Sequence, residues 1–153
     1  MANTYTQIHI QTIFAVSNRQ SLISGKWEDE LYKYITGIIQ NQGHKVLQFN
    51  GTTDHIHIVF GMRPNQSLSD LMKNVKQDSS AWINKKGFIN GRFSWQAGYG
   101  AFSNSKSDLP RVIEYVRNQK QHHKKESFMD EYLRFLKEFE IDFDERYILK
   151  AIS

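Results

Sequence analysis

The chain has 153 residues, of which 39% are hydrophobic and 24% are charged, as in a folded domain rather than a disordered or fibrous chain. It contains no cysteine, which excludes disulfides, iron–sulfur clusters, thiolate zinc sites and a cysteine nucleophile. No apolar run approaches the roughly 20 residues of a membrane span, and the first ten residues lack the pattern of a signal peptide. We therefore expect one cytoplasmic domain, residues 1–153, without a membrane partner.

Positive charge is concentrated in one stretch of the chain. The 20 Lys and Arg residues against 16 Asp and Glu residues give a net charge of +4. In residues 111–125 a single acidic residue, Glu114, accompanies the basic residues Arg111, Arg117, Lys120, Lys124 and Lys125. Such a stretch is compatible with a nucleic-acid partner, but a solvated helix face has the same charge pattern. On charge alone the solvated helix face is the preferred interpretation.

Four segments have the pattern of β-strands. In residues 6–16, Ile8 and Ile10 share one face and His9 and Gln11 share the other, and this two-residue period predicts a strand with one buried face. The remaining predicted strands are residues 45–50, 55–60 and 100–103.

Two predicted helices separate these strands. Apolar residues recur at helical spacing from Trp27 until Gly43, which is expected to stop the first helix. The second helix begins at the capping box of residues 67–70 and stops before Gly87. The resulting order predicts an α+β fold, the ferredoxin-like βαββαβ antiparallel sheet with both crossover helices on one face. The first and third strands then lie at the centre of the sheet, and its other face remains for function.

Two further helices follow the sheet. The first is expected to begin near Asp108 and Pro110, a plausible cap and first-turn proline, and to run to about Lys124. The second begins at a capping box that starts with Ser127. Its predicted buried residues are Met129, Tyr132, Leu133, Leu136 and Phe139.

The third predicted strand carries a His-x-His motif, His55 and His57. Because side chains alternate along a strand, both imidazoles point to the face that the crossover helices leave free, together with His9 and Gln7 or Gln11 of the first strand. Two imidazoles on a rigid strand can share one metal ion. Strands also expose polar residues in alternation, so the motif by itself is weak evidence for a metal site.

The predicted helix after the sheet carries a second polar pair. Tyr115 and Gln119 are four residues apart and so lie on one helix face. They are offset by about a quarter turn from the apolar stripe that includes Val112 and Val116. Taken singly, Tyr115 would be an amphipathic residue at the edge of the core and Gln119 a solvated one.

Four motifs together resemble the small single-tyrosine HUH transposases of insertion sequences, an IS200-like family. The motifs are Asp-His-Ile-His-Ile at 54–58, Gly-Tyr-Gly-Ala-Phe-Ser at 98–103, Tyr-Val-Arg-Asn-Gln at 115–119 and His-His-Lys-Lys-Glu-Ser-Phe at 122–128. The resemblance extends from the first strand to about Tyr147. It implies that Tyr115 is the nucleophile and that His55, His57 and Gln119 bind a divalent metal, Mg²⁺ or Mn²⁺.

The resemblance also implies the reaction and the partners. The enzyme would be a DNA transposase that cleaves and rejoins single-stranded DNA through a 5′-phosphotyrosine intermediate, acting on hairpin ends of a mobile element. The family further implies a homodimer whose active sites are shared between subunits, with Tyr115 of one subunit facing the histidines of the other. No general base stands out, because Asp54 is expected on the opposite side of the strand from the histidines, and His122 and His123 receive no role.

Weaker assignments concern DNA contacts. We expect Arg117, Lys120, Lys124 and Lys125 to approach DNA phosphates, although a solvated helix face is nearly as well supported. Three aromatic residues could stack on unpaired bases, but packing in the core explains them better: Trp95, Tyr99 and Phe102.

Two other functions remain open at this point. A non-catalytic module that binds single-stranded nucleic acid would leave the four candidate site residues unexplained, and the chain lacks the aromatic signature of an RNA-recognition sheet. A metal-dependent phosphodiesterase would use water in place of Tyr115. A covalent protein–DNA adduct separates the transposase from both.

Overall fold

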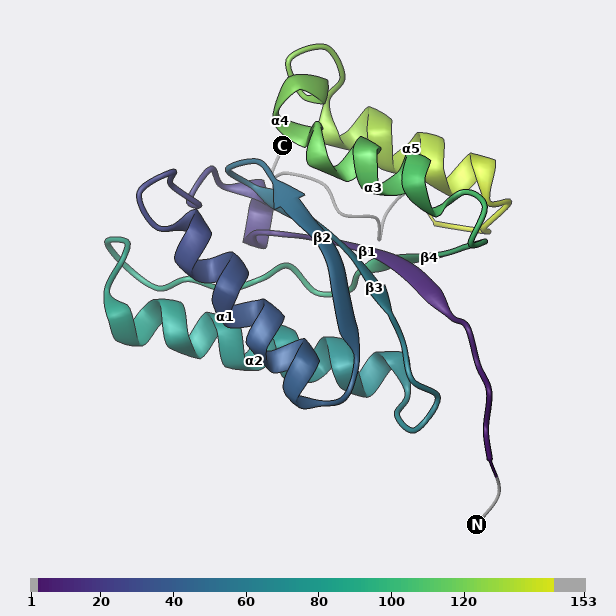
Figure 1. Ribbon diagram of the computed structural model, residues 1–153. Coiled ribbons are helices and arrows are strands. Elements are labelled where there is room, and N and C mark those ends of the chain that lie inside the picture. Colours follow the sequence, from purple (N-terminus) through teal and green to yellow (C-terminus); the bar gives the residue numbers. More distant parts are fainter. Residues whose placement is uncertain (1–2, 145–153) are drawn as a thin grey trace.

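The computed structural model describes residues 3–144, and Tyr147, where the resemblance ends, lies outside them. The described residues form a four-stranded antiparallel sheet with strand order β2-β3-β1-β4 and helices on both faces (Figure 1). In chain order the elements are β1 (His9–Ala15), the 3-10 turn η1 (Ser17–Arg19), α1 (Glu28–Asn41), β2 (Lys45–Gly51), β3 (His55–Gly61), α2 (Leu68–Lys86), β4 (Gly100–Asn104), α3 (Leu109–Arg117), α4 (Gln119–His122) and α5 (Phe128–Glu138).

The predicted ferredoxin-like arrangement is confirmed. β1 and β3 lie at the centre of the sheet and pair antiparallel, with Ala15 opposite His55 and His9 opposite Gly61. β1 is shorter than the predicted residues 6–16, because both neighbouring strands end opposite His9, at Gly61 and Asn104.

One face of the sheet, here called the crossover face, carries Ile56, Ile58 and Phe60 of β3 and is covered by α1 and α2 (Figure 1). α2 begins and ends as its sequence predicts. The Ser67 side chain accepts a hydrogen bond from the Asp70 amide at the start of α2, and Gly87 follows its last residue in the left-handed conformation, with φ of +67°. A glycine adopts this conformation without the steric cost of a Cβ atom.

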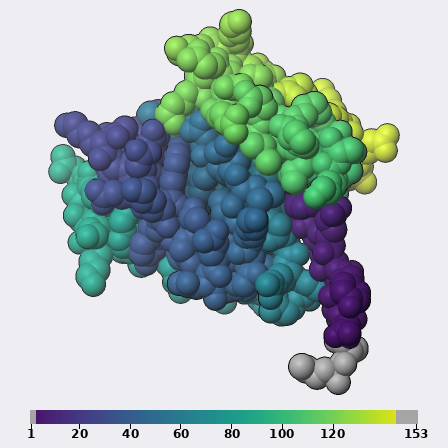
Figure 2. Space-filling model, viewed as in Figure 1, coloured from purple at the N-terminus to yellow at the C-terminus, as the bar shows by residue number. Residues whose placement is uncertain are grey.

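The opposite face, here called the site face, carries His55, His57 and Val59 of β3. The C-terminal helices α3, α4 and α5 cover its upper part (Figures 1 and 2). Apolar contacts fix them on either side of the histidines. Val59 packs against α3, whereas Ile13 and Ala15 of β1 pack against α5. The face left free by the crossover helices is therefore an interior between the sheet and the C-terminal helices.

Two details of the C-terminal helices differ from expectation. The helix predicted from Asp108 to Lys124 breaks at Asn118, whose φ and ψ of −95° and 18° are not helical, so α3 and α4 are separate. The buried side of α5 is also rotated from the predicted one, since Met129 and Leu133 are only half-buried and Phe139 is exposed. Its buried residues are Phe128, Glu131, Tyr132, Phe135 and Leu136.

The three aromatic residues considered for base stacking belong to the protein interior. Trp95 and Phe102 are buried, and Tyr99 is a half-buried neighbour of the crossover-face core. The Trp95 indole nitrogen donates a hydrogen bond to the Ser79 hydroxyl at 2.8 Å. Packing, the preferred interpretation of these residues, is confirmed. Among residues 3–144, no helix is both long enough and apolar enough to cross a bilayer.

Candidate active site

The two histidines of the motif lie side by side on β3 and are fully buried. The strand places both rings on the site face, as the alternation predicts, with ring centroids 5.2 Å apart. Phe128 of α5 covers the His55 ring at 4.3 Å, and Tyr115 of α3 approaches the His57 ring at 6.3 Å. Residues from the C-terminal helices therefore close the site over the strand.

Each motif histidine has its Nδ1 atom held by an oxygen. His55 Nδ1 lies 2.7 Å from Asp54 Oδ1, and because an ionised carboxylate can only accept, this nitrogen carries the proton. His57 Nδ1 lies 2.9 Å from Gln11 Oε1 of the neighbouring strand. Both arrangements leave the Nε2 atoms turned toward the C-terminal helices, which is how a metal-binding histidine is oriented by a second polar group.

The expected orientation of Asp54 is wrong. The alternation rule placed its carboxylate on the opposite side of the strand from the histidines, but β3 begins only at His55. Asp54 belongs to the preceding turn, where Thr52 donates a hydrogen bond to the same carboxylate oxygen at 3.0 Å. The rule for strands does not apply outside the strand, and the turn brings the carboxylate to His55.

Tyr115 and Gln119 reach the same place despite the break between α3 and α4. The Tyr115 hydroxyl donates to Glu131 Oε2, and Gln119 Nε2 donates to the same oxygen at 3.1 Å. Gln119 is fully buried, so it is not the solvated residue that it would be if taken alone. Tyr115 is half-buried, as expected at the edge of the core, but its hydroxyl is bonded inside the site. All four predicted site residues, His55, His57, Tyr115 and Gln119, thus meet around one carboxylate.

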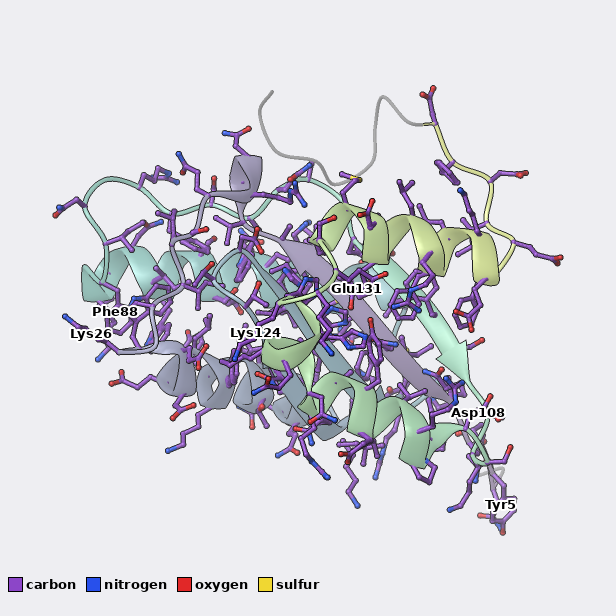
Figure 3. The ribbon with its side chains drawn as sticks, turned by 90° about the horizontal axis from the view of Figure 1, so that it is seen from above. Tyr5, Lys26, Phe88, Asp108, Lys124 and Glu131 are labelled. Atoms are coloured by element: carbon purple, nitrogen blue, oxygen red, sulfur yellow. The ribbon has the colours of Figure 1, made fainter. Side chains whose placement is uncertain are left out.

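That carboxylate, Glu131 of α5, is the main residue that the sequence interpretation missed. Figure 3 shows it between α5 and the helices α3 and α4. Its Oε1 atom lies 3.0 Å from Nε2 of both His57 and His123, and the side chain is fully buried. A signal for it exists in the sequence, because Phe128, Glu131 and Phe135 follow one another at helical spacing, which puts a charge within the apolar stripe of α5.

Burial and neighbouring charges determine the protonation of His55 and Glu131. Burial lowers the pKa of His55 to about 4, which keeps its imidazole neutral. Burial alone would raise the pKa of Glu131, but the charge of His57 and hydrogen bonds from His123, His57 and Tyr115 outweigh it and hold that pKa far below its usual range. Glu131 is therefore an ionised carboxylate in the interior.

The Tyr115 hydroxyl has a strongly raised pKa. Burial is the largest cause and the negative charge of Glu131 is the second. Arg134 acts in the opposite direction, since its Nη2 atom donates to the same hydroxyl at 2.8 Å. Because Glu126 holds Arg134 in place through bonds of 3.0 and 3.2 Å, the tyrosine oxygen has an acceptor on one side and a fixed cation on the other.

The residues present fit a divalent cation. Within residues 3–144, the buried atoms without a hydrogen-bond partner include His55 Nε2 and Gln119 Oε1. Both belong to predicted ligands, and a neutral imidazole nitrogen and an amide oxygen are suitable donors for such an ion. The ligand atoms of His55, His57, His123 and Glu131 also lie within 4.8 Å of one another.

The four basic residues expected on DNA lie in different settings. Lys120 is held by the protein, with its Nζ atom 2.8 Å from Asn50 Oδ1 and 3.2 Å from Glu28 Oε1. Arg117 pairs with Glu114 of its own helix at 2.7 Å. Lys124 and Lys125 are exposed in the turn between α4 and α5. Their contact with DNA stays a prediction.

The site is assembled within a single chain. The tyrosine helix packs on its own sheet, and Tyr115 contacts Glu131, which contacts His57 of the same chain. The expected sharing of the site, with the tyrosine of one subunit facing the histidines of another, stays a prediction. A homodimer itself remains a prediction.

Comparison of the sequence with known families identifies the class of protein to which this sheet and its site belong, the transposases. Residues 4–119 match the family described as "Transposase IS200 like". This match covers well over half of the chain, and the chain belongs to the IS200-like transposase family. The matched region ends at Gln119, so His123, Glu131 and Arg134 lie beyond it.

Individual relatives are transposases as well. The chain is 24% identical over 118 residues to the ISDra2 transposase TnpA of Deinococcus radiodurans, covering 74% of this chain and 84% of that protein. A solved structure of a candidate transposase from D. radiodurans R1 has a TM-score of 0.63 at 18% identity, covering 78% of this chain and 95% of that one. A REP-associated tyrosine transposase bound to a REP hairpin has a TM-score of 0.61 at 12% identity, over 100% and 96% of the two chains. These two structures share the fold.

Proposed function

We propose that this protein is a single-tyrosine DNA transposase that cleaves and rejoins single-stranded DNA through a covalent 5′-phosphotyrosine. The observation that carries the proposal is the meeting of the Tyr115 hydroxyl and the motif histidines at one buried carboxylate. Family membership supports DNA transposition as the process in which this chemistry is used.

In the proposed reaction the Tyr115 oxygen forms a bond to phosphorus while the bond from phosphorus to the 3′ oxygen breaks. The phenolic proton leaves the tyrosine and the departing 3′ oxygen gains one, so the exchange is balanced. A later attack by another 3′-OH on the phosphotyrosine restores a phosphodiester and frees the tyrosine. Because the covalent bond preserves the energy of the original phosphodiester, rejoining needs no nucleoside triphosphate.

The chain would hold a divalent metal, Mg²⁺ or Mn²⁺, through His55, His57 and Gln119. Such an ion would polarise the phosphoryl group and stabilise the departing oxygen. The protein's own part is orientation: Asp54 and Gln11 fix the histidine rings, and Arg134 donates to the tyrosine oxygen that makes the attack. Arg134 opposes the rise in the pKa of that oxygen, which favours the reactive phenolate.

A covalent adduct with DNA is the test of this proposal. Labelled single-stranded DNA from the ends of the encoding element is incubated with the protein and Mn²⁺, and denaturing gels report label attached to protein. Wild type and Tyr132→Phe should form the adduct, since Tyr132 is a buried tyrosine of the same sheet face without a bond to Glu131. Tyr115→Phe should form none while still binding DNA.

The other outcomes identify the competing functions. DNA that is cut without becoming attached to protein indicates a metal-dependent phosphodiesterase that uses water. DNA that is retained but not cut indicates a binding module. Adduct in Tyr115→Phe would mean that a different residue is the nucleophile.

The expected partners are hairpin ends of single-stranded DNA and a second copy of the chain. The solved REP-associated relative is described as bound to a hairpin, which supports the first. For the second, subunits carrying Tyr115→Phe are mixed with subunits carrying His55→Ala and His57→Ala. Recovery of adduct after verified subunit exchange requires sites shared between subunits, whereas sites within single chains stay inactive in every combination.

A further inference from the structure

Glu131 stands between the histidines and the nucleophile, and each of its oxygens faces one of them. Oε1 lies 3.0 Å from His57 Nε2, 3.0 Å from His123 Nε2 and 3.8 Å from His55 Nε2. Oε2 accepts from the Tyr115 hydroxyl and from Gln119. No other carboxylate among residues 3–144 contacts both groups.

The spacing of these atoms matches a coordination sphere. Adjacent ligand atoms about 2.1 Å from a cation lie about 3 Å from each other. The contacts of Glu131 Oε1 with His57 and His123 have this spacing. A contact between an imidazole nitrogen and a carboxylate oxygen is bridged either by a proton or by a cation, so the same geometry can accept a metal without rearrangement of the backbone.

A purely structural role explains Glu131 poorly. Taking an ionised carboxylate out of water costs several kcal/mol even when it is paired, and its helix neighbours Phe128 and Phe135 show that an apolar residue fits this side of α5. Two further atoms of the site, His55 Nε2 and Gln119 Oε1, are buried without a hydrogen-bond partner. These two atoms can serve as metal ligands in the same site to which Glu131 brings a negative charge.

We infer that Glu131 and His123 are additional ligands of the metal site, and that Glu131 couples this site to the nucleophile, with Oε1 for the cation and Oε2 for the Tyr115 hydroxyl. The inference rests on the proposed function and adds two ligands from the segment that follows the family match. Three imidazoles and one carboxylate favour a transition ion such as Mn²⁺ over Mg²⁺. The C-terminal helices would then supply both the nucleophile and part of the metal site.

Mn²⁺ titration of the metal-stripped full chain, by calorimetry, tests the ligand assignment. Glu131→Gln keeps the size of the side chain and removes its charge. It should weaken Mn²⁺ binding at least about tenfold, because changes even in residues that only orient metal ligands weaken binding by that factor. His123→Asn should weaken binding to a similar extent. Asp130→Asn is the matched control, because it removes the same charge from the neighbouring, exposed position, and its affinity should stay within about twofold of wild type.

His57→Gln distinguishes a failure of the two additional ligands from a failure of the proposed metal site. If His57→Gln weakens Mn²⁺ binding but Glu131→Gln and His123→Asn do not, the additional ligands are wrong and the proposed function stands. If none of the three variants changes the affinity, the metal site of the proposed function is itself wrong.

The coupling to Tyr115 has its own test. Glu131→Met has nearly the same shape but offers only a thioether sulfur, a weak acceptor, whereas Glu131→Gln keeps an amide oxygen that accepts well. At saturating Mn²⁺, Glu131→Gln should recover most of the rate of adduct formation, and Glu131→Met should remain about tenfold slower or more. Equal rates for Glu131→Met and wild type, with circular dichroism showing both folded, would overturn the coupling.

Discussion

The two faces of the sheet bury different side chains: one buries an apolar core, and the other buries polar residues between two apolar clusters. The crossover face forms a continuous apolar core with α1 and α2, including Phe14, Ile35 and Ile58. The site face is also buried, but its apolar contacts are divided into two smaller clusters, one with α3 and one with α5. Between them lie His55, His57, Gln119 and Glu131, all fully buried.

This difference separates folding from function. Apolar burial stabilises a fold at about 25 cal/mol per Å², whereas buried polar groups cost free energy unless each is partnered. The crossover face supplies the first, and the site face retains unpartnered atoms at His55 and Gln119. We therefore expect changes on the crossover face to affect stability and changes on the site face to affect metal binding and chemistry.

The largest expected effect is on the crossover face. Ile35 of α1 is fully buried there, and Ile35→Ala should lower the free energy of unfolding by about 2–5 kcal/mol through lost burial and a cavity. Urea denaturation measures the loss. The folded fraction should bind Mn²⁺ with unchanged affinity, and a large change in that affinity would contradict the separation between the faces. Ile39→Val, expected to cost about 0.5–1.5 kcal/mol, is a milder variant of the same face.

The second prediction concerns acid stability. His55 has a folded pKa of about 4 against 6.5 in the unfolded chain, so the unfolded state binds the proton first. Stability is complete above pH 6.5 and falls as the pH decreases toward 4, by about 3 kcal/mol over the whole interval. Denaturation of metal-free protein between pH 7 and 4.5 measures this, and His55→Gln should flatten the curve. Parallel curves for the two proteins would contradict it.

Because that experiment stops at pH 4.5, protonation of Glu131 does not contribute to the loss of stability it measures. The pKa of Glu131 is lowered in the folded protein from an ordinary 4.5, so its contribution is present above pH 4.5 and is lost only as the pH falls below that value. A loss of stability that begins near pH 6.5 is therefore not caused by Glu131, and its absence in His55→Gln assigns it to His55.

The third prediction concerns the cation beside the nucleophile. Arg134 donates to the Tyr115 hydroxyl at 2.8 Å and opposes the rise of its pKa. Arg134→Gln should slow adduct formation about tenfold to a hundredfold, with a larger part of the rate recovered at high pH. Lys137→Gln, an exposed cation one turn later on α5, is the control. An equal loss in both variants would indicate a general charge effect.

The smallest effects are expected at the basic surface. Lys124 is exposed, and Lys124→Gln should reduce the slope of log affinity for single-stranded DNA against log salt by about 0.7 if the side chain contacts one phosphate. Lys120 is half-exposed and contacts Glu28 and Asn50, so Lys120→Gln should mainly cost stability, by less than about 1 kcal/mol. An unchanged slope in Lys124→Gln would remove that residue from the DNA-binding surface.

The sequence determined the fold and the four residues on which the proposed chemistry depends. Alternation placed His55 and His57 together because a strand fixes the direction of each side chain. The spacing of four between Tyr115 and Gln119 directed both side chains to one place even though the helix breaks at Asn118. Local geometry was sufficient to pair these side chains, and the family resemblance supplied their expected roles.

The surroundings of those residues were decided by the tertiary structure. Asp54 reaches His55 from a turn, to which no periodic rule applies. Glu131 enters the site because α5 packs against Ile13 and Ala15, and there it meets His123, the residue that follows α4. The docking of α5 also fixes which of its sides is buried. An isolated helix does not reveal its rotation when Met129, Tyr132 and Leu133 compete with Phe128 and Phe135 for the core. The sheet makes that choice, since it offers an apolar surface on either side of the histidines and a polar one between them.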